Sequence, residues 1–435
     1  MAVETLPVRV SRAPGVSGRL LRDEPYRRED LDTYRATRGS AAWEPQTLLA
    51  MVEAARLRGR GGAAFPAATK LGAVRAAAGP LRHAVANGEE GEPASFKDRY
   101  LLRMRPHLVL DGLWAAASIV DAGQAHVYVS DPAAAASVRA ALAELDEAPP
   151  VPTAVVEVAP AYVAGEETAV VRAINGGPAK PTVKPPRPFD AGVDGCPTLV
   201  QNVETLAHLA LIAAHGPEAH LAHGSPDSTG TCLLTVSSPG GHATLLETPF
   251  GPALSTAVMQ AGCPPAAELL MGGFFGGLLP AAHTGLALSY DALTAAGTCL
   301  GSGAVVALGG DDCPVAVVAD VMSYFARFNA EQCGTCIKGT AAMRDVLRAL
   351  ADGAAAAGDV ERLRRWSSSL GGRGACSLLD GATRLARTLL EHYPELVASH
   401  LRAPCDTCAA WGLGSPEPAA RFAIHRPDPS EEGHA

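Results

Sequence analysis

The fold is decided by the stretch Arg58-Gly59-Arg60-Gly61-Gly62-Ala63-Ala64-Phe65-Pro66, which is followed by Lys70. Glycines allow a backbone to approach a phosphate closely and to direct its N–H groups at it. Arg60 and Lys70 would add positive charge to such a site. The stretch therefore predicts a phosphate-binding loop, with a flexible turn between helices as the alternative.

The residues before this loop exclude a Rossmann dinucleotide fold. Gly59, Gly61 and Ala64 formally fit the G-x-G-x-x-G/A fingerprint, but that fingerprint requires a strand immediately before it. Residues Glu44–Leu57 instead show the apolar spacing of an amphipathic helix. We therefore expect a Gly-rich loop that follows a helix.

Composition narrows the class of protein. The 435 residues are enough for two to four domains of roughly 100–200 residues each. The formal net charge of −9 argues against a nucleic-acid-binding surface, which would need basic patches. No run reaches the ~18 apolar residues of a membrane span, and Met1–Arg22 lacks the apolar centre of a signal peptide. We expect a soluble, cytoplasmic protein that does not itself span a membrane.

The pattern along the chain predicts three folded units between a loose N-terminal arm (1–44) and a C-terminal tail (401–435). Strand-like and helical pieces alternate from 45 to 225 and favour an α/β domain, with strands at His126–Val129 and Val155–Val158 and a helix starting at Asp131-Pro132. Short β-rich runs from 226 to 312 indicate a small α+β module. Residues 313–400 are helical in pattern, and the last ~25 residues, rich in Pro and charge, are expected to be disordered.

Three further segments could face a polar ligand. The first carries three acids in four positions and reads Asn87-Gly88-Glu89-Glu90-Gly91-Glu92-Pro93. Its carboxylates and amide suit ribityl hydroxyls or a nicotinamide amide. The alternative is a solvated acidic turn. The second leads into the start of a helix and reads Tyr162-Val163-Ala164-Gly165-Glu166-Glu167-Thr168. Its two acids suit either capping of that helix or contact with a cofactor. Gln201-Asn202-Val203-Glu204-Thr205 could contact a ligand or simply begin a helix.

The ten cysteines include two C-x-x-C pairs, Cys333/Cys336 and Cys405/Cys408, with Cys376 between them. In a cytoplasmic chain of this size, such pairs indicate metal or redox chemistry before structural disulfides. An iron–sulfur cluster, a zinc ion and a dithiol redox pair all fit this spacing.

Taken in order, these segments resemble the NADH-oxidising flavoprotein subunit of respiratory complex I and its relatives in bidirectional hydrogenases and formate dehydrogenases. That family carries RGRGGAGFP, NADEGEP with FKDR, a Tyr before GEET, KPP, NNVET and a cysteine cluster motif. This chain has RGRGGAAFP, NGEEGEP with FKDR, YVAGEET, KPPRP, QNVET and QCGTC. The resemblance covers about residues 32–400, and residues 231–308 resemble the family's ubiquitin-like SLBB module.

The resemblance implies an α/β FMN-binding domain, an SLBB module and a C-terminal helical bundle that carries an iron–sulfur site. The implied cofactors are FMN, NADH or NADPH, and a [4Fe-4S] cluster, and the implied partner is an iron–sulfur or ferredoxin-like subunit. The nicotinamide would deliver a hydride to the flavin, which would pass electrons singly to the cluster. The cofactors supply this chemistry, and the protein supplies position and electrostatics.

The resemblance also assigns roles position by position. Glu92, near the nicotinamide, and Glu167, beside the place of hydride transfer, would be catalytic. FMN and the nucleotide would be held by Gly59, Arg60, Gly61, Gly62, Phe65, Lys70, Asn87, Glu89, Glu90, Tyr162, Glu166, Lys184, Val200, Gln201, Asn202 and Thr205. The cluster would be bound by Cys333, Cys336 and Cys376.

Five positions depart from the family pattern. Ala64 and Gln201 stand where the family has Gly and Asn, which are mild changes. Ala73 and Arg187 stand where the family has Phe rings for the adenine, and such stacking contributes roughly 1–3 kcal/mol per ring. Gly339 stands at the third cysteine of the cluster motif. The cluster would then use three cysteines and another ligand, with Cys405 or Cys408 as candidates; it could also be a three-iron cluster or absent.

These departures leave two alternatives to an NADH-oxidising role. The loss of the aromatic rings would suit an FMN/iron–sulfur electron carrier that does not use NADH. A non-catalytic scaffold inside a redox complex is the second alternative. The acceptor, whether a quinone-complex, a ferredoxin or another carrier, is not fixed by the sequence.

Overall fold

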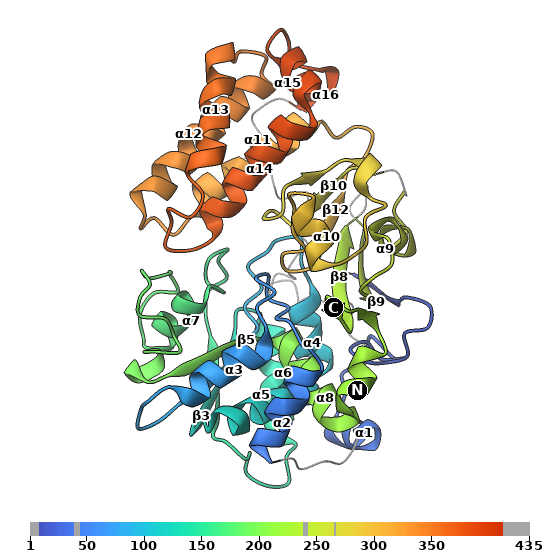
Figure 1. Ribbon diagram of the computed structural model, residues 1–435, viewed down its shortest axis with the longest axis vertical. Helices are drawn as coiled ribbons and strands as arrows, with labels where there is room; N and C mark the ends of the chain where they lie inside the picture. Colours follow the sequence, from blue (N-terminus) through green and yellow to red (C-terminus); the bar gives the residue numbers. More distant parts are fainter. Residues whose placement is uncertain (1–7, 39–43, 238–241, 265–266, 412–435) are drawn as a thin grey trace, which may run out of the picture.

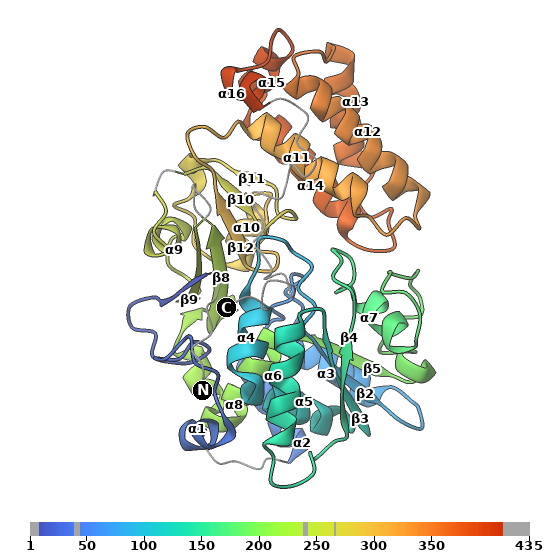
Figure 2. The ribbon, with the colours of Figure 1, turned by 180° about the vertical axis from the view of Figure 1, so that it is seen from behind.

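The computed structural model describes residues 8–38, 44–237, 242–264 and 267–411, which form three units (Figures 1 and 2). A parallel sheet surrounded by helices occupies the lower part of Figure 1. A mixed sheet lies beside it, and a helical bundle stands at the opposite end of the molecule.

Four parallel strands form the centre of the first unit, in the order β4 (Thr153–Glu157), β3 (Gln124–Val129), β2 (His83–Asn87) and β5 (Thr198–Asn202). Successive side chains point to opposite faces of the sheet. Ala84 and Ala86 therefore join the large core under the helices, whereas Val85 packs with Val170 of α7 on the other face. The two strands expected from the sequence correspond to β3 and β4.

Helices cover both faces of this sheet. The start expected at Asp131-Pro132 is confirmed, since Asp131 accepts the backbone N–H of Ala134 and Pro132 occupies the first turn. The helices of the unit are α2 (Pro45–Ala54), α3 (Ala67–Ala76), α4 (Lys97–Met104), α5 (Pro106–Val120), α6 (Pro132–Ala143), α7 (Glu167–Ile174) and α8 (Val203–Leu221), with a short turn η1 (Val193–Gly195).

Residues 8–37 are not the loose arm that the polar composition of this segment predicts. Strand β1 (Arg9–Arg12) pairs in parallel with β9, and α1 (Leu31–Thr37) follows. Leu20 and Leu21 are completely buried, and their backbone N–H groups donate to the Glu247 carboxylate. The partner strand lies far along the chain, so the local pattern could not reveal the pairing.

The second unit is built on a six-stranded mixed sheet in the order β1-β9-β8-β12-β10-β11. Along β8, Leu233 packs into the core of the first unit and Leu234 into the core of the second. The sheet thus joins the two units. Its elements are β8 (Thr231–Ser237), β9 (Ala243–Pro249), β10 (Leu269–Met271), β11 (Leu278–Leu279), β12 (Ala304–Ala307), α9 (Leu254–Gln260), η2 (Ala281–His283) and α10 (Tyr290–Ala295), preceded by the hairpin β6 (Gly224–Ser225) and β7 (Ser228–Thr229).

The third unit is helical, as predicted, and its core is apolar. Val318, Met322 and Phe325 follow one another at helical spacing on α11 and are completely buried. The helices are α11 (Pro314–Arg327), α12 (Gly334–Ala351), α13 (Ala357–Ser369), α14 (Leu378–His392), α15 (Pro394–His400) and α16 (Asp406–Trp411). None of the described helices is both long and apolar enough to cross a bilayer.

The expected tail does not begin at residue 401. Helix α16 lies within it, and Cys408 of that helix is buried. The stretch predicted to be disordered, 412–435, lies outside the described residues.

Candidate functional site

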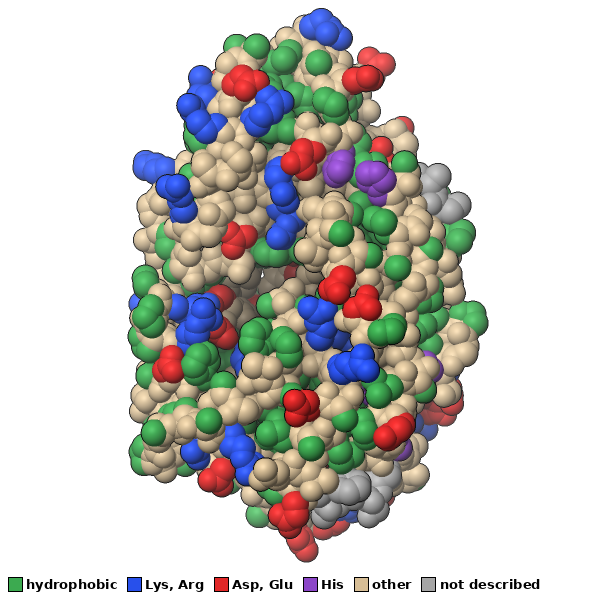
Figure 3. Space-filling model, in the orientation of Figure 1, with side chains coloured by type: hydrophobic (Ala, Val, Ile, Leu, Met, Phe, Trp, Pro, Cys, Tyr) green, Lys and Arg blue, Asp and Glu red, His purple; other side chains and the backbone are tan. Residues whose placement is uncertain are grey.

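Many of the predicted site residues meet at the carboxyl edge of the parallel sheet. Asn87 and Asn202 end the neighbouring strands β2 and β5 and are paired directly in the register. In open α/β sheets, ligands bind at this edge. Figure 3 shows the molecule hollowed where the α/β unit faces the helical unit.

The Gly-rich loop lies against this edge and follows a helix, α2, as expected. The Gly59 N–H donates to the Phe65 carbonyl (2.8 Å), and the Arg60 N–H donates to Thr205 Oγ1 (2.8 Å). A Cβ at Gly61 would lie 3.1 Å from the Asn202 Cβ, and Gly62 has a φ of +115°. Glycine therefore lets the loop backbone approach the start of α8, where an anion is favoured.

The side chain of Arg60 is directed into the protein, where it donates to the Arg58 carbonyl (3.0 Å), which corrects the expectation that it adds charge to a phosphate site. Its guanidinium is buried and donates to the carbonyls of Thr229 (2.9 Å) and Thr231 (3.2 Å) and to the Tyr290 hydroxyl (3.1 Å). It also lies over the Phe250 ring. Arg60 therefore fastens the loop to the second unit.

Asn87 and Glu89 lie together at the end of β2. Asn87 Nδ2 donates to the Gly165 carbonyl (2.8 Å), whereas its Oδ1 is buried without a hydrogen-bond partner among the described residues. Glu89 Oε1 accepts from Ser130 Oγ (3.2 Å). A buried amide oxygen without a partner is costly, so Asn87 marks a place where a ligand donor would be accommodated.

Glu90 points into the protein rather than toward a ligand, contrary to its assigned role. Its carboxylate accepts the backbone N–H groups of Lys97 (2.9 Å), Asp98 (3.2 Å) and Arg99 (3.1 Å) at the start of α4. Burial alone would raise the pKa of Glu90, but the Arg99 and Lys97 cations and these donors together lower it. Glu90 is thus the N-terminal cap of α4.

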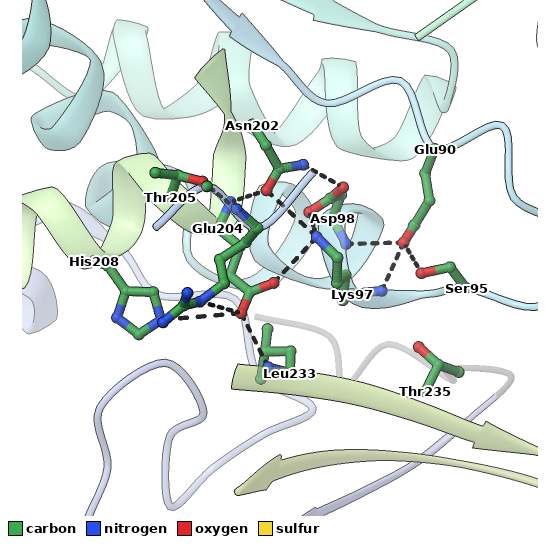
Figure 4. Close-up of polar contacts among 12 residues, drawn as sticks. Glu90, Ser95, Lys97, Asp98, Asn202, Glu204, Thr205, His208, Leu233 and Thr235 are labelled. Carbon is green, nitrogen blue, oxygen red and sulfur yellow. Dashed lines mark hydrogen bonds and ion pairs between the residues drawn. The ribbon is translucent and has the colours of Figure 1, made fainter. Parts of the chain in front are cut away.

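A buried network that the sequence reasoning missed supports the end of β5 (Figure 4). The Lys97 ammonium contacts Asp98 Oδ1 (2.6 Å), Glu204 Oε2 (3.1 Å) and Asn202 Oδ1 (3.3 Å). Asn202 Nδ2 in turn donates to Asp98 Oδ2 (2.7 Å). The FKDR and QNVET segments supply the charged residues of this network, but only the fold brings Lys97 and Glu204 together.

Glu92 lies where the three units meet. Its carboxyl accepts the backbone N–H of Phe274 (3.1 Å) from the second unit and a hydrogen bond from the Tyr162 hydroxyl. The Tyr162 ring packs edge-on against Tyr324 and Phe325 of α11. Burial raises the pKa of Glu92 to about 8, so the group is largely protonated at neutral pH.

The start of α7 holds two carboxylates between two lysines. Glu166 caps the helix by accepting the Thr168 N–H (2.9 Å) and pairs with Lys184 Nζ (2.6 Å). Glu167 lies 3.4 Å from both Lys70 Nζ and Lys184 Nζ. Burial would raise the pKa of Glu167, but the two ammonium groups outweigh it and lower the value. Glu167 is therefore ionised at neutral pH.

The remaining predicted contacts differ in exposure. Val200 and Gln201 are buried within β5, and the Val200 side chain faces α7. Phe65 is 52% exposed and Arg187 is also exposed. Exposed groups such as these could stack on a base, whereas Val200 would contribute only its backbone.

Cys333, Cys336 and Cys376, which were predicted to bind a cluster, lie in the same part of the helical unit. The Ala375 N–H donates to Cys333 Sγ (3.4 Å), and the pKa of Cys336 is raised by burial and by the neighbouring Cys376 and Cys333 thiols. Gln332, the residue next to Cys333, accepts a hydrogen bond from Arg172 Nη1 of α7 (2.8 Å). The three-cysteine site therefore adjoins α7.

Cys405 and Cys408 do not complete this site, which corrects that expectation. They lie with Cys313 and His400. Cys313 precedes α11, and Cys333 follows its far end. The 14 residues of α11 span about 21 Å, so the two groups are well separated.

Comparisons with known proteins agree with this arrangement. Residues 52–211 match the model of the Nuo51 FMN-binding domain, and residues 316–400 match the NADH-ubiquinone oxidoreductase-F iron-sulfur binding region. The chain is 32% identical to the F 2 subunit of NADH-quinone oxidoreductase from Rhizobium meliloti (strain 1021), covering 85% of this chain and 92% of that protein. It is 31% identical to the corresponding F subunit from Mycobacterium bovis (strain ATCC BAA-935 / AF2122/97), covering 86% and 89%.

A solved structure is also similar. The crystal structure of NAD+-reducing [NiFe]-hydrogenase in the H2-reduced state matches with a TM-score of 0.76 and 33% identity. The match covers 87% of this chain and 68% of that one.

Proposed function

The chain belongs to the family of NADH-quinone oxidoreductase F subunits, and from that premise we propose that it is an NADH-oxidising flavoprotein that passes electrons to an iron–sulfur chain. One observation carries the proposal: Arg172 of α7 donates to Gln332 Oε1 (2.8 Å), and Gln332 is the residue next to Cys333. At the other end of α7, the Gly165 carbonyl accepts a hydrogen bond from Asn87 (2.8 Å) at the edge of the sheet. A flavin site and a cluster site would therefore lie at the two ends of this short helix.

The crevice residues fit FMN. The backbone of Gly61 and Gly62 and the start of α8 suit a phosphate. The buried Asn87 Oδ1, which has no hydrogen-bond partner among the described residues, suits a ribityl hydroxyl or a ring N–H. Bound FMN would supply hydride acceptance and the release of single electrons.

We assign the nicotinamide nucleotide to the crevice opposite α7. Glu167, ionised between two lysines, would orient the nicotinamide, and the protonated Glu92 would donate a hydrogen bond to its amide. Phe65 is exposed for stacking on the adenine, and the Arg187 guanidinium would take the place of a missing ring or meet a 2′-phosphate. This arrangement would hold the nicotinamide against the flavin.

The donor set near α12 fits an iron–sulfur cluster with three protein thiolates, from Cys333, Cys336 and Cys376. Gly339 lies one helical turn after Cys336 on the same face of α12, where the family pattern has a cysteine. A cluster there would supply one-electron transfer. The protein's part is to hold the thiolates beside α7.

We also propose that residues 231–308 are an SLBB module that braces the site. Two sets of contacts support this role. Arg60 bonds to Thr229, Thr231 and Tyr290. Glu92 accepts the backbone N–H of Phe274. The partner would be an iron–sulfur or ferredoxin-like subunit. The location would be the cytoplasm or the cytoplasmic side of a membrane complex.

The test is the visible spectrum of the anaerobically purified chain before and after NADH is added. We expect a flavin spectrum that NADH bleaches. In Glu167→Gln the flavin should remain bound while its reduction slows by on the order of tenfold or more, the cost of losing a charged hydrogen bond. The exposed Glu147→Gln serves as the control.

Three results would contradict the proposal. Unchanged reduction in Glu167→Gln would remove the role of that carboxylate. Flavin that NADH leaves oxidised would indicate an electron carrier with another donor. A chain that binds no flavin after reconstitution would be a scaffold.

A further inference from the structure

A second group of metal ligands lies at the end of the helical unit that is remote from the three-cysteine site. Cys313 precedes α11, His400 ends α15, and Cys405 and Cys408 belong to the turn into α16. The ligand atoms of these four residues all lie within 4.8 Å of one another. We propose that they bind one zinc ion, independently of the flavin and the cluster.

The distances within the group match tetrahedral zinc. His400 Nε2 lies 3.6 Å from Cys313 Sγ and 3.5 Å from Cys408 Sγ. Tetrahedral bonds of about 2.3 Å to sulfur and 2.0–2.1 Å to nitrogen place a sulfur and a nitrogen about 3.6 Å apart. One ion at the centre can therefore reach His400, Cys313 and Cys408, and Cys405 Sγ lies within 4.8 Å of their ligand atoms.

The imidazole is already oriented as a ligand. His400 is completely buried, and its Nδ1 lies 2.9 Å from the Leu396 carbonyl. A hydrogen bond from Nδ1 to that carbonyl fixes the tautomer and leaves the Nε2 lone pair for a metal, as metal-binding histidines commonly do. The Cys408 N–H points to Cys405 Sγ (3.5 Å), which would stabilise a thiolate there.

The geometry favours a single ion over the other uses of these residues. An iron–sulfur cluster distributes its ligands over two or more irons and therefore spaces them more widely than a single ion does. A disulfide between Cys405 and Cys408 would leave Cys313 and His400 directed at a centre with nothing to bind. Three thiolates and one imidazole in a closed, largely buried set are typical of structural zinc.

The consequence of such an ion would be mechanical. It would fasten α15 and α16 to the beginning of α11, so that the last described segment closes the bundle. Zinc has no redox chemistry, so the ion would take no part in electron transfer. Its binding would displace the thiol protons and stabilise the folded bundle.

The experiment is metal analysis of the full chain purified anaerobically without added metal. We expect about one zinc per chain, in addition to any iron. Cys408→Ser and His400→Ala should lower zinc at least about fivefold while iron and flavin per chain stay unchanged. Cys196→Ser, which changes a partly exposed thiol elsewhere, should retain the zinc.

X-ray absorption at the zinc edge of the unaltered chain does not depend on a variant that folds. It should show three sulfurs and one nitrogen. The proposal would be overturned by any of four results. These are a purified chain without zinc, zinc that is retained in Cys408→Ser, iron bound at this site, or a Cys405–Cys408 disulfide in the mass spectrum. The flavin and NADH tests above can fail without affecting this result, and the reverse also holds.

Discussion

Replacing Glu92 by glutamine should change how stability depends on pH. Burial raises the pKa of Glu92 from 4.5 to about 8, which corresponds to an upper limit of roughly 5 kcal/mol of preference for the neutral form at about 1.4 kcal/mol per pKa unit. Below pH 4.5 the carboxyl is neutral whether the chain is folded or unfolded. As pH rises toward 8, the unfolded chain loses the proton first, so the folded state is progressively destabilised. Above about 8 the cost is constant.

The amide introduced by Glu92→Gln cannot ionise. Its single oxygen can accept only one of the two backbone N–H groups that Glu92 accepts on separate oxygens, from Ala94 on Oε1 (3.3 Å) and from Phe274 on Oε2 (3.1 Å), so the variant carries a constant cost that does not depend on pH. The stability of this variant relative to the unaltered chain should therefore rise between pH 4.5 and 8, by up to about 5 kcal/mol. Urea unfolding followed by tryptophan fluorescence at several pH values measures this difference, with the exposed Glu53→Gln as the control. A difference that stays constant across this range would refute the argument that burial holds Glu92 protonated.

Three further predictions test other parts of the molecule. Lys97→Met should destabilise the chain by about 3–5 kcal/mol in urea unfolding, because it leaves buried carboxylates without their cation; a loss no larger than that of the exposed Lys338→Met would show that the network is not stabilising. Ala64 has a φ of +50°, so Ala64→Gly should raise stability by roughly 0.5–1 kcal/mol, and a lowered urea midpoint would contradict the strain. Gly339→Cys should convert a three-iron type of electron paramagnetic resonance signal to a four-iron type, because it supplies the missing thiolate. The new side chain can be accommodated, since the atom closest to an added Cβ is the end of the Leu370 side chain, at 3.0 Å. An unchanged signal would exclude position 339 as a ligand site.

The sequence predicted those parts of the fold that have a local pattern. Strands β3 and β4, the start of α6 at Asp131 and the helical third unit were visible from periodicity and capping. The meeting of Asn87 and Asn202 was not, because it depends on the parallel pairing of two strands that no local pattern connects. Ordered motifs implied a shared site, but only the sheet register explains why those residues are neighbours.

The direction of side chains was the part that sequence could not supply. Arg60 and Glu90 stand in motifs that indicate a ligand, yet both are directed into the protein. In the sequence, a charged residue in a Gly-rich or acidic loop looks the same whether its side chain contacts a ligand or packs inside the protein. Cys405 and Cys408 show the same ambiguity, since their partner Cys313 was one of five scattered cysteines.

Strand β1 can pair with β9 only after most of the first two units has been synthesised at the ribosome. Leu20 donates to Glu247, which lies 227 residues further along the chain, and β1 pairs with β9 in the same region. At about 5–20 residues per second, the N-terminal segment waits roughly 10–45 s for its partner to emerge. During that interval the backbone N–H groups of Leu20 and Leu21 lack their native acceptor and β1 lacks its partner strand, so we expect a nascent chain to recruit a chaperone at this segment.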